Sequence, residues 1–328
     1  MPGIFKSEDD FVRWLRRRVD FGHKGSWVGI GDDAAVLQAE AGNLLLTTDF
    51  SLEGVHFDFG LHPAESVGHR ALARSLSDVA AMGGRPHFAL VSLAFSERAT
   101  RRWVERFYGG LLRLARRFHV AVVGGDTVRS PYMTAVDVAV LGKTSRGGPL
   151  LRSGARPGDR IYVAGDLGSS ALGLELIRRR ARPSSAVERR AVRAHLYPEP
   201  QCELGQWVAQ HGLASAAIDL SDGLSTDLHR LCAASGVGAR VHAARLPVVA
   251  RVQGEALKTL SLALHGGEDY RLLFTVSPRK VSTLHRARLG VRLFEIGEVT
   301  SSRKLVLVSD DGSEEQLKPE GYDHFRRP

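Results

Sequence analysis

Residues 75–84 read SLSDVAAMGG, and they end a predicted helix. Apolar side chains recur along this helix at intervals of three and four, which is the period of a helix that buries one face. The pair Gly83-Gly84, followed by Pro86, is a strong signal for the helix to stop. The sequence therefore predicts a helix over residues 63–82 that packs through one face. The residues on that face are Val67, Ala71, Leu72, Leu76 and Val79.

Predicted strands and helices alternate on both sides of this helix. Upstream, residues 34–37 and 44–48 predict two strands around a turn at 39–43, and a capped helix is expected from Ser7. Downstream, apolar stretches predict the remaining elements of the first half. These are a buried strand at 88–95, a helix at 97–118, a strand to Val123, a turn at 124–126 and a strand at 133–141.

The composition changes around residues 143–157, where Gly, Arg, Ser and Pro accumulate. A chain of 328 residues is long enough for two domains, so we expect one domain at 1–148 and another at 149–328. Elements also alternate in the second half, which predicts α/β layers in both domains. The expected strands are 161–164, 216–220, 271–276 and 304–308, with helices after Gly168 and from Leu224.

The chain carries 45 Lys and Arg residues against 36 Asp and Glu, a formal net charge of +9. Such an excess is compatible with a nucleic-acid-binding protein. However, the arginine clusters lack interleaved aromatic residues, and no RNP, zinc-finger or helix-turn-helix pattern is present. Clusters of this kind usually form solvated helix faces, so nucleic acid is not an expected partner.

The two cysteines, Cys202 and Cys232, are too few for a disulfide framework, and no CxxC pair is present to hold zinc. The N-terminal segment carries charges where a signal peptide needs an apolar core. No stretch approaches the roughly 18 apolar residues of a membrane-spanning helix. We therefore expect a cytoplasmic protein without a membrane partner.

The informative chemistry is a set of aspartates, each placed where a predicted element ends and flanked by small residues. If residues 34–48 form a hairpin that turns near Ala41, then Asp33 and Asp49 lie at equal distances from the turn. Paired strands about 4.8 Å apart would bring these two carboxylates together. Carboxylates this close repel each other unless a cation lies between them. The set is Asp32, Asp33, Asp49, Asp78, Asp126, Asp219 and Asp222.

Two further positions favour a divalent cation. Asp78 falls in the last turns of its helix, at the negative end of the macrodipole, where an acid is unfavourable by about 0.3–1 kcal/mol unless a cation compensates it. Asp219 and Asp222 flank a strand-to-helix junction with Ser221 between them, and the backbone N–H groups of such a junction can meet a phosphate. Because Mg²⁺ takes oxygen ligands from carboxylates and phosphates, the pattern predicts a magnesium site.

Larger motifs lie around these aspartates in a fixed order. They are GIGDDAAV, TTD followed by LEGVHF, SLSDVAAMGGRP, FYGGL, VVGGDT, RSGARPGD, IDLSDGL, GGEDY and GYDHF. In this order they resemble the thiamine-monophosphate kinases, which belong to the ATP-binding superfamily that includes aminoimidazole ribonucleotide synthetase. The aspartate pattern marks the superfamily, whereas EGVHF, GGEDY and GYDHF are more specific to the kinases.

The resemblance implies a fold and an activity. The fold is α/β (α+β), the two-domain aminoimidazole ribonucleotide synthetase-like fold, with an N-terminal ATP- and Mg-binding sheet domain that dimerises and a C-terminal α/β domain. The activity is that of a phosphotransferase with a phosphate group as acceptor. ATP would phosphorylate thiamine monophosphate to thiamine diphosphate, the last step of thiamine diphosphate biosynthesis, in a homodimer with several Mg²⁺ ions.

The resemblance also implies roles for individual residues. The implied metal ligands are Asp33, Thr47, Thr48, Asp49, Asp78, Asp126, Asp219 and Asp222. The implied nucleotide contacts are Tyr108, Gly125, Asp126, Arg152 and Ser221. The implied contacts to thiamine phosphate are His56, Glu268 and Tyr322. The family often has Asn-Leu-Ser-Asp where this chain has Ser75-Leu76-Ser77-Asp78, but the aspartate is retained.

The chemistry agrees with these roles. A phosphate monoester is largely dianionic at pH 7, so no general base is expected, and the difficulty is to bring two polyanions into line. His56 can donate to the substrate phosphate and Arg152 to the phosphates of the nucleotide. Glu268 suits the cationic or amine-bearing part of thiamine, and Tyr322 can stack on a ring. The catalytic role then falls to the metal-held Asp49, Asp78, Asp126 and Asp222.

Two alternatives stay open. One is another ATP-dependent enzyme of the same superfamily, either selenophosphate synthetase-like or from the purine pathway. Selenophosphate synthetases usually carry a reactive cysteine near the N-terminus, and this chain has none before Cys202. The other is a basic nucleic-acid-binding protein whose aspartates are only turn residues.

Overall fold

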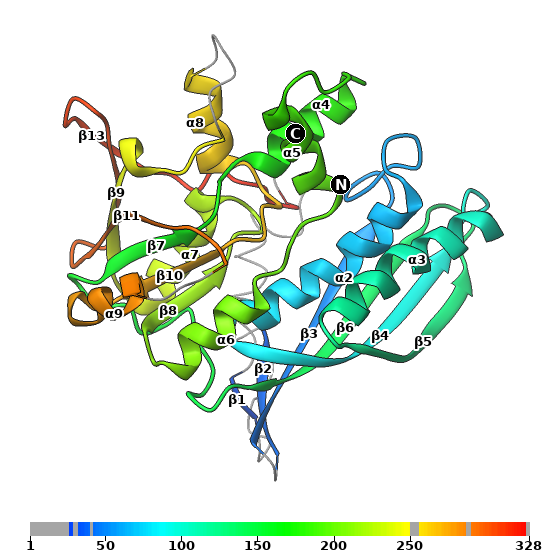
Figure 1. Ribbon diagram of the computed structural model, residues 1–328, viewed down its shortest axis with the longest axis horizontal. Helices are drawn as coiled ribbons and strands as arrows, with labels where there is room; N and C mark the ends of the chain where they lie inside the picture. The colour runs from blue at the N-terminus through cyan, green and yellow to red at the C-terminus, as the bar shows by residue number, and fades with distance from the viewer. Residues whose placement is uncertain (1–25, 29–31, 40–41, 250–255, 287–289, 326–328) are drawn as a thin grey trace.

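The computed structural model describes residues 26–28, 32–39, 42–249, 256–286 and 290–325. Within these residues the strands form two sheets, and helix α2 (Ala64–Ala81) contacts both of them (Figure 1). The helix expected after Ser7 lies outside the described residues and stays a prediction. None of the described helices is both long enough and apolar enough to span a membrane.

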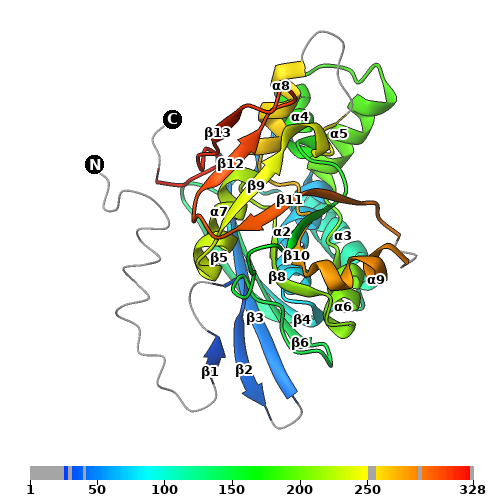
Figure 2. The ribbon, with the colours of Figure 1, turned by 90° about the vertical axis from the view of Figure 1, so that its left-hand side faces the viewer.

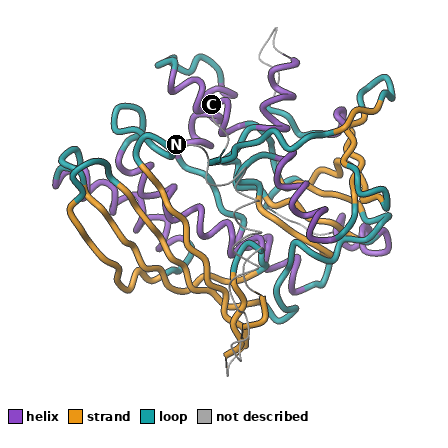
Figure 3. The backbone as a smooth tube through the Cα atoms, turned by 180° about the vertical axis from the view of Figure 1, so that it is seen from behind, coloured by secondary structure: helices purple, strands orange, loops and turns teal. Residues whose placement is uncertain are grey.

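The first sheet has the strand order β1-β2-β3-β6-β4-β5 and is antiparallel except between β4 and β5. Helix α2 lies on one face of it, and α3 (Arg101–Arg117) packs against α2, so both helices lie behind the strands in Figure 3. The strands are β1 Ser26–Val28, β2 Ala35–Ala39, β3 Gly42–Leu52, β4 Gly84–Phe95, β5 Ala121–Arg129 and β6 Ala135–Thr144.

The second sheet has the order β13-β12-β9-β11-β7-β10-β8, and only β9 and β12 pair in parallel. Figure 2 shows its strands β12, β9 and β11 above β2 and β3 of the first sheet. The strands are β7 Arg160–Ala164, β8 Ala214–Asp219, β9 Gly238–His242, β10 Leu272–Val276, β11 Leu293–Thr300, β12 Leu305–Val308 and β13 Glu314–Gln316. The helices are α4 Ser169–Arg178, α5 Ala186–Leu196, α6 Cys202–Gln210, α7 Leu224–Ser235, α8 Ala256–His265 and α9 Val281–Arg286.

One hydrophobic core joins the two halves of the chain. Leu72 and Leu76 of α2 are fully buried in the same cluster as Phe274 of β10. Helix α6 lies so close to α2 that a Cβ on Gly205 would fall 2.0 Å from the carbonyl oxygen of Ala80. Only glycine fits at this position. The boundary expected at residues 148/149 falls in the connection between β6 and β7, and the core extends across it.

The predicted elements agree with the structure in most places and fail at the glycine pair of VVGGDT. Residues 124–126, expected as a turn, lie inside β5. Gly125 has a φ of 150° and passes so close to β4 that a Cβ would lie 1.8 Å from the carbonyl oxygen of Val91. The glycines therefore mark a close approach of two backbones rather than a reversal of the chain. The sequence also missed β1, α5, α6, α8, α9, β9, β11 and β13.

The face of the first sheet that points away from α2 is apolar and exposed. The strand at 88–95, expected to be fully buried, alternates instead, and no described helix covers its outer side chains. Apolar side chains exposed on this outer face are Leu46 (38%), Phe50 (54%), Phe88 (46%), Leu90 (48%) and Val128 (53%). This outer face is therefore an exposed surface with several large apolar side chains.

Candidate functional site

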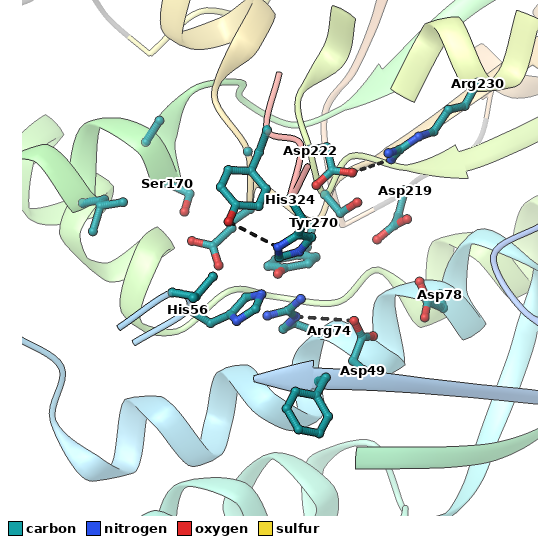
Figure 4. A pocket seen from close by; sticks show the side chains of 18 of the residues that line it. Asp49, His56, Arg74, Asp78, Ser170, Asp219, Asp222, Arg230, Tyr270 and His324 are labelled. Carbon is teal, nitrogen blue, oxygen red and sulfur yellow. Dashed lines mark hydrogen bonds and ion pairs between the residues drawn. The ribbon is translucent and has the colours of Figure 1, made fainter. Parts of the chain in front are cut away.

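A cleft of about 1170 Å³ opens where α2, the end of β3 and the junction between β8 and α7 converge (Figure 4). Helix α4 and residues 319–324 close its other side. Many residues that the sequence singles out line this one cleft. They are Asp49, His56, Asp78, Arg152, Asp219, Ser221, Asp222, Glu268 and Tyr322.

Three carboxylates meet at one end of the cleft. Asp33, Asp78 and Asp219 each present an oxygen, and these atoms all lie within 4.8 Å of one another. Burial and the nearby Asp49 raise the pKa of Asp78 well above its ordinary value, and burial and Asp33 do the same for Asp219. Carboxyl groups with pKa values raised in this way bind a cation in exchange for their protons.

Hydrogen bonds fix the orientation of these carboxylates. Thr47 donates its hydroxyl to Asp78 at 2.5 Å, and Ser77 donates to Asp219 at 2.6 Å. Arg152 donates from two nitrogens to the two oxygens of Asp33, at 3.0 and 2.8 Å. Each aspartate thus accepts a hydrogen bond from a side chain outside the cluster and faces the remaining two acids. Carboxylates that bind metal ions are usually oriented by hydrogen bonds of this kind.

Asp32 supports the cluster without joining the three converging acids. It accepts the backbone N–H of Asp33 at 2.9 Å and that of Arg152 at 3.2 Å. Burial and the charge of Asp33 raise its pKa to about 6. Asp32 therefore fixes the backbone of the segment that carries Asp33.

The hairpin of β2 and β3 is present, but it does not pair Asp33 with Asp49. Its register aligns Ala39 with Gly42, which is shifted by one residue from a turn centred on Ala41. Asp49 lies instead 3.5 Å from Nε of Arg74 on α2. Asp33 is close to acids from α2 and β8, so the cluster arises from the packing of the two halves and not from the hairpin.

Thr48 is separated from the cluster by the alternation of side chains along β3. Its hydroxyl donates to Asp137 of β6 at 2.6 Å, on the exposed outer face of the sheet. Asp126 lies in the same row of that face, because Ser92 pairs with both Asp126 and Asp137. Within one chain, the structure does not bring the side chains of Thr48 or Asp126 to the three acids. Tyr108 and Gly125 do not line the cleft either.

Asp222 lies at the start of the junction before α7. It pairs with Arg230, which also contacts Asp227 at 3.1 Å. Asp227 accepts the backbone N–H groups of Asp222 and Gly223, at 3.0 and 3.1 Å. Burial and Asp222 raise its pKa to about 7. The sequence missed Asp227 and Arg230, although an acid in the first turn of a helix was a signal for a capping role.

The opposite end of the cleft contains His56 and Glu268. The backbone N–H of Leu52 donates to Nδ1 of His56 at 3.0 Å, and burial together with Arg74 lowers the pKa of His56 to about 3. The ring is therefore neutral at pH 7 with its proton on Nε2, which leaves Nε2 as a donor for a ligand.

Glu268 is held by basic residues. Burial alone would raise its pKa, but the charges of Arg70 and Arg74 outweigh that effect, and the pKa falls to about 2. Glu268 forms an ion pair with Arg70, and its other oxygen lies 3.6 Å from Nδ1 of His195. Its backbone has a φ of 66°, a strained conformation for a residue with a side chain. The cleft thus contains a carboxylate that is charged and fixed in position.

The arginines of α2 are not among the residues that the sequence motifs single out, although their spacing is regular. Arg70, Arg74 and Asp78 are spaced by four residues, so they share one face of the helix. Arg70 contacts His195 of α5 at 3.0 Å, and His195 in turn contacts His62 at 3.0 Å. Charged residues at helical spacing usually form solvated faces, and only packing shows that this face is buried.

Comparisons with known proteins agree with this architecture. Residues 31–144 match the family described as AIR synthase related protein, N-terminal domain, and residues 156–310 match the corresponding C-terminal domain. The thiamine-monophosphate kinase of Bacillus subtilis is 36% identical over 310 residues, covering 93% of this chain and 95% of the relative. That of Escherichia coli K12 is 38% identical over 307 residues, covering 92% and 93%.

A solved structure shows the same similarity in three dimensions. AaThiL complexed with AMPPCP and TMP matches with a TM-score of 0.84 and 33% identity, covering 97% of both chains. The similarity therefore extends over both sheets and the cleft between them.

Proposed function

The chain belongs to the thiamine-monophosphate kinase family, and we propose that its cleft transfers the γ-phosphoryl group of ATP to thiamine monophosphate, giving thiamine diphosphate and ADP. The observation that carries this proposal is the convergence of Asp33, Asp78 and Asp219 beside a cleft that also contains His56 and Glu268. These groups are suited to holding two polyanions and one cationic ring system at the same time.

We propose Mg²⁺ as the cation of this site. The donor set fits it, because the converging atoms are carboxylate oxygens. Burial, together with the neighbouring acids, raises the pKa values of Asp78 and Asp219, and a bound cation would stabilise their charged forms. Asp33, Asp78 and Asp219 would hold it, with Asp49 and Asp222 lining the same end of the cleft. When bound, Mg²⁺ supplies neutralisation of the phosphate charge.

The chain's own residues then position the reactants. Nε2 of His56 donates to the phosphate of thiamine monophosphate, and Glu268 faces the cationic part of that substrate. Arg152 and Ser221 lie at the acid cluster, where they meet the phosphates of the nucleotide. Tyr322, 47% exposed at the mouth of the cleft, is placed to stack on a ring of the substrate. No residue acts as a general base, because the acceptor phosphate is already an anion.

We further propose that two copies associate through the outer face of the first sheet. Phe50 lies on that face and also lines the cleft, so a copy packed there reaches the cleft. Asp126 lies in the same row as Phe50 and Asp137, on the face that a second copy would cover. We propose that Asp126 of one copy completes the cleft of the other, with residues 1–148 as the associating domain and 149–328 as the second domain.

Purified protein tests the reaction directly. With ATP, Mg²⁺ and thiamine monophosphate it should form thiamine diphosphate and ADP, and chelation of Mg²⁺ should stop both products. Absence of thiamine diphosphate at high enzyme concentration contradicts the proposal. We place the reaction in the cytoplasm, where ATP is available and where the buried Cys202 and Cys232 stay reduced.

A mixing experiment tests the association. Asp126→Asn and Asp219→Asn should each be inactive alone, but dissociating and reassociating an equal mixture should restore roughly a quarter of the wild-type activity, because half of the random dimers then contain one intact cleft. No recovery in a mixture that has formed mixed dimers contradicts a site shared between copies. Light scattering that shows a monomeric wild-type protein contradicts the association itself.

A further inference from the structure

Arg74 projects from the middle of α2 into the cleft, between His56 and Asp49 (Figure 4). Its side chain is 14% exposed and lies 3.5 Å from the carboxylate of Asp49 through Nε. Asp78, which follows it by one helical turn, faces the acid cluster. Arg74 is therefore the basic residue of α2 that stands between the substrate end and the acid end of the cleft.

The guanidinium of Arg74 has donors without acceptors. Nε and Nη1 are buried, and neither forms a hydrogen bond with any of the described residues. The contact from Nε to Asp49 lacks hydrogen-bond geometry, although it is an ion pair. Leaving buried donors of a charged group unsatisfied is costly, and native proteins rarely retain such donors unless a ligand completes them.

The chemistry of the surroundings identifies the ligand. A guanidinium is a planar set of donors that matches the oxygens of a phosphate, and it stays charged even when buried. The carboxylates whose charges act on it include Asp49, on the side of the acid cluster, and Glu268, at the opposite end of the cleft. A dianionic phosphate that enters between His56 and the acid cluster is thus the group that would provide acceptors for the free donors of Arg74.

We propose that Arg74 binds the phosphate of thiamine monophosphate and holds it in line with the nucleotide, an inference that rests on the proposed function. His56 and Arg74 then donate hydrogen bonds to the acceptor phosphate from two sides. His56 is the neutral donor, and Arg74 is the cation. The ion pair with Asp49 keeps the guanidinium oriented before the substrate arrives. Arg74 accordingly binds the acceptor substrate and not ATP.

The first test compares Arg74→Met, which keeps the length of the stem, with Arg74→Lys, which keeps the charge but not the planar donors. For Arg74→Met we expect kcat/KM for thiamine monophosphate to fall by about 10- to 100-fold, the loss typical of a hydrogen bond to a charged group, with the KM for ATP unchanged. Arg74→Lys should lose less. Arg101→Met, which removes one positive charge from an exposed side chain of α3, is the matched control and should change neither constant.

A binding measurement makes the test specific for the phosphate. By calorimetry, wild-type protein should bind thiamine monophosphate more tightly than thiamine, and Arg74→Met should reduce this ratio by about tenfold or more while thiamine binding stays the same. If Arg74→Met does not fold, the same ratio in Arg74→Lys decides the question. Unchanged ratios, or a rise in the KM for ATP alone, overturn the proposal.

The two proposals fail in different ways. Wild-type protein that forms no thiamine diphosphate refutes the proposed function, and the ratio of the two binding constants still reports on Arg74. Wild-type protein that is active, together with an Arg74→Met variant that keeps its kcat/KM for thiamine monophosphate within about twofold, refutes only the role of Arg74.

Discussion

Replacing Asp78 by Asn should make the metal-free protein more stable while removing its activity. Asp78, Asp33 and Asp219 present oxygens within 4.8 Å of one another. At an effective dielectric constant of about 20, two unit charges at this distance repel by about 3.5 kcal/mol. The ion pair of Arg152 with Asp33 offsets part of this repulsion. Asn keeps an oxygen that accepts the hydroxyl of Thr47, so the packing of the site is retained.

The measurement is urea unfolding in EDTA at several pH values. At pH 7 we expect the free energy of unfolding of Asp78→Asn to exceed that of wild type by about 2–3 kcal/mol. Because the folded pKa of Asp78 is raised, wild type loses stability as the pH rises above the ordinary value of 3.8, so the advantage of Asn should shrink as the pH is lowered toward that value. Asp310→Asn, which removes an exposed acid after β12, should show no such gain.

Magnesium reverses the comparison. At about 100 times its dissociation constant, Mg²⁺ should stabilise wild type by about 2.7 kcal/mol, and Asp78→Asn should gain much less. The variant should also lose at least about 100-fold in kcat/KM. If Asp78→Asn is less stable than wild type in EDTA, or if Mg²⁺ stabilises both proteins equally, the acid cluster is not a repulsive cation site.

Three other predictions follow from single residues. Glu268→Gln should raise the KM for thiamine monophosphate by about tenfold or more without affecting that for ATP, in steady-state kinetics, because the carboxylate faces the cationic ring. Burial and Arg70 lower the pKa of His195 to about 3, so wild type should lose stability as the pH falls below about 6.5, by about 1.4 kcal/mol per pH unit from this group. In urea unfolding at pH 5 to 7, the free energy of unfolding of His195→Gln should therefore depend less steeply on pH. An unchanged pH dependence would contradict a buried neutral ring. Gly125→Ala should lower the melting temperature sharply, since its Cβ would meet the carbonyl oxygen of Val91 at 1.8 Å, and an unchanged melting temperature would show that β4 and β5 can separate.

The sequence alone was sufficient to predict an element where its local pattern coincides with its buried face. The helix expected over 63–82 is found as α2 at Ala64–Ala81, because its period of apolar residues and its glycine stop are both local properties. The strands predicted at 34–37 and 44–48 around a turn likewise overlap β2 at Ala35–Ala39 and β3 at Gly42–Leu52. The motif order also identified the family, which the comparisons confirm.

Local pattern failed where a residue's role depends on another segment of the chain. The GG of VVGGDT was interpreted as a turn because glycine permits both a reversal and a close approach of strands, and only the neighbouring β4 decides between them. Thr48 and Asp126 belong to motifs of the family, yet the register of the sheet puts their side chains on its outer face. The proposed role of Asp126 in a cleft therefore depends on the proposed association of two copies.

The amino-acid sequence by itself identified helix α2, the family and the aspartates that are candidates for the chemistry, since all of these follow from spacing and residue type. Only the tertiary structure decided which acids meet, because Asp33, Asp78 and Asp219 come from three distant segments that the shared core brings together. It also decided that Arg74, one of many arginines in a chain of net charge +9, is buried in the cleft with donors that none of the described residues satisfies. Burial changes the energy of a charge far more than its place in the sequence does, and burial is a property of the packed chain.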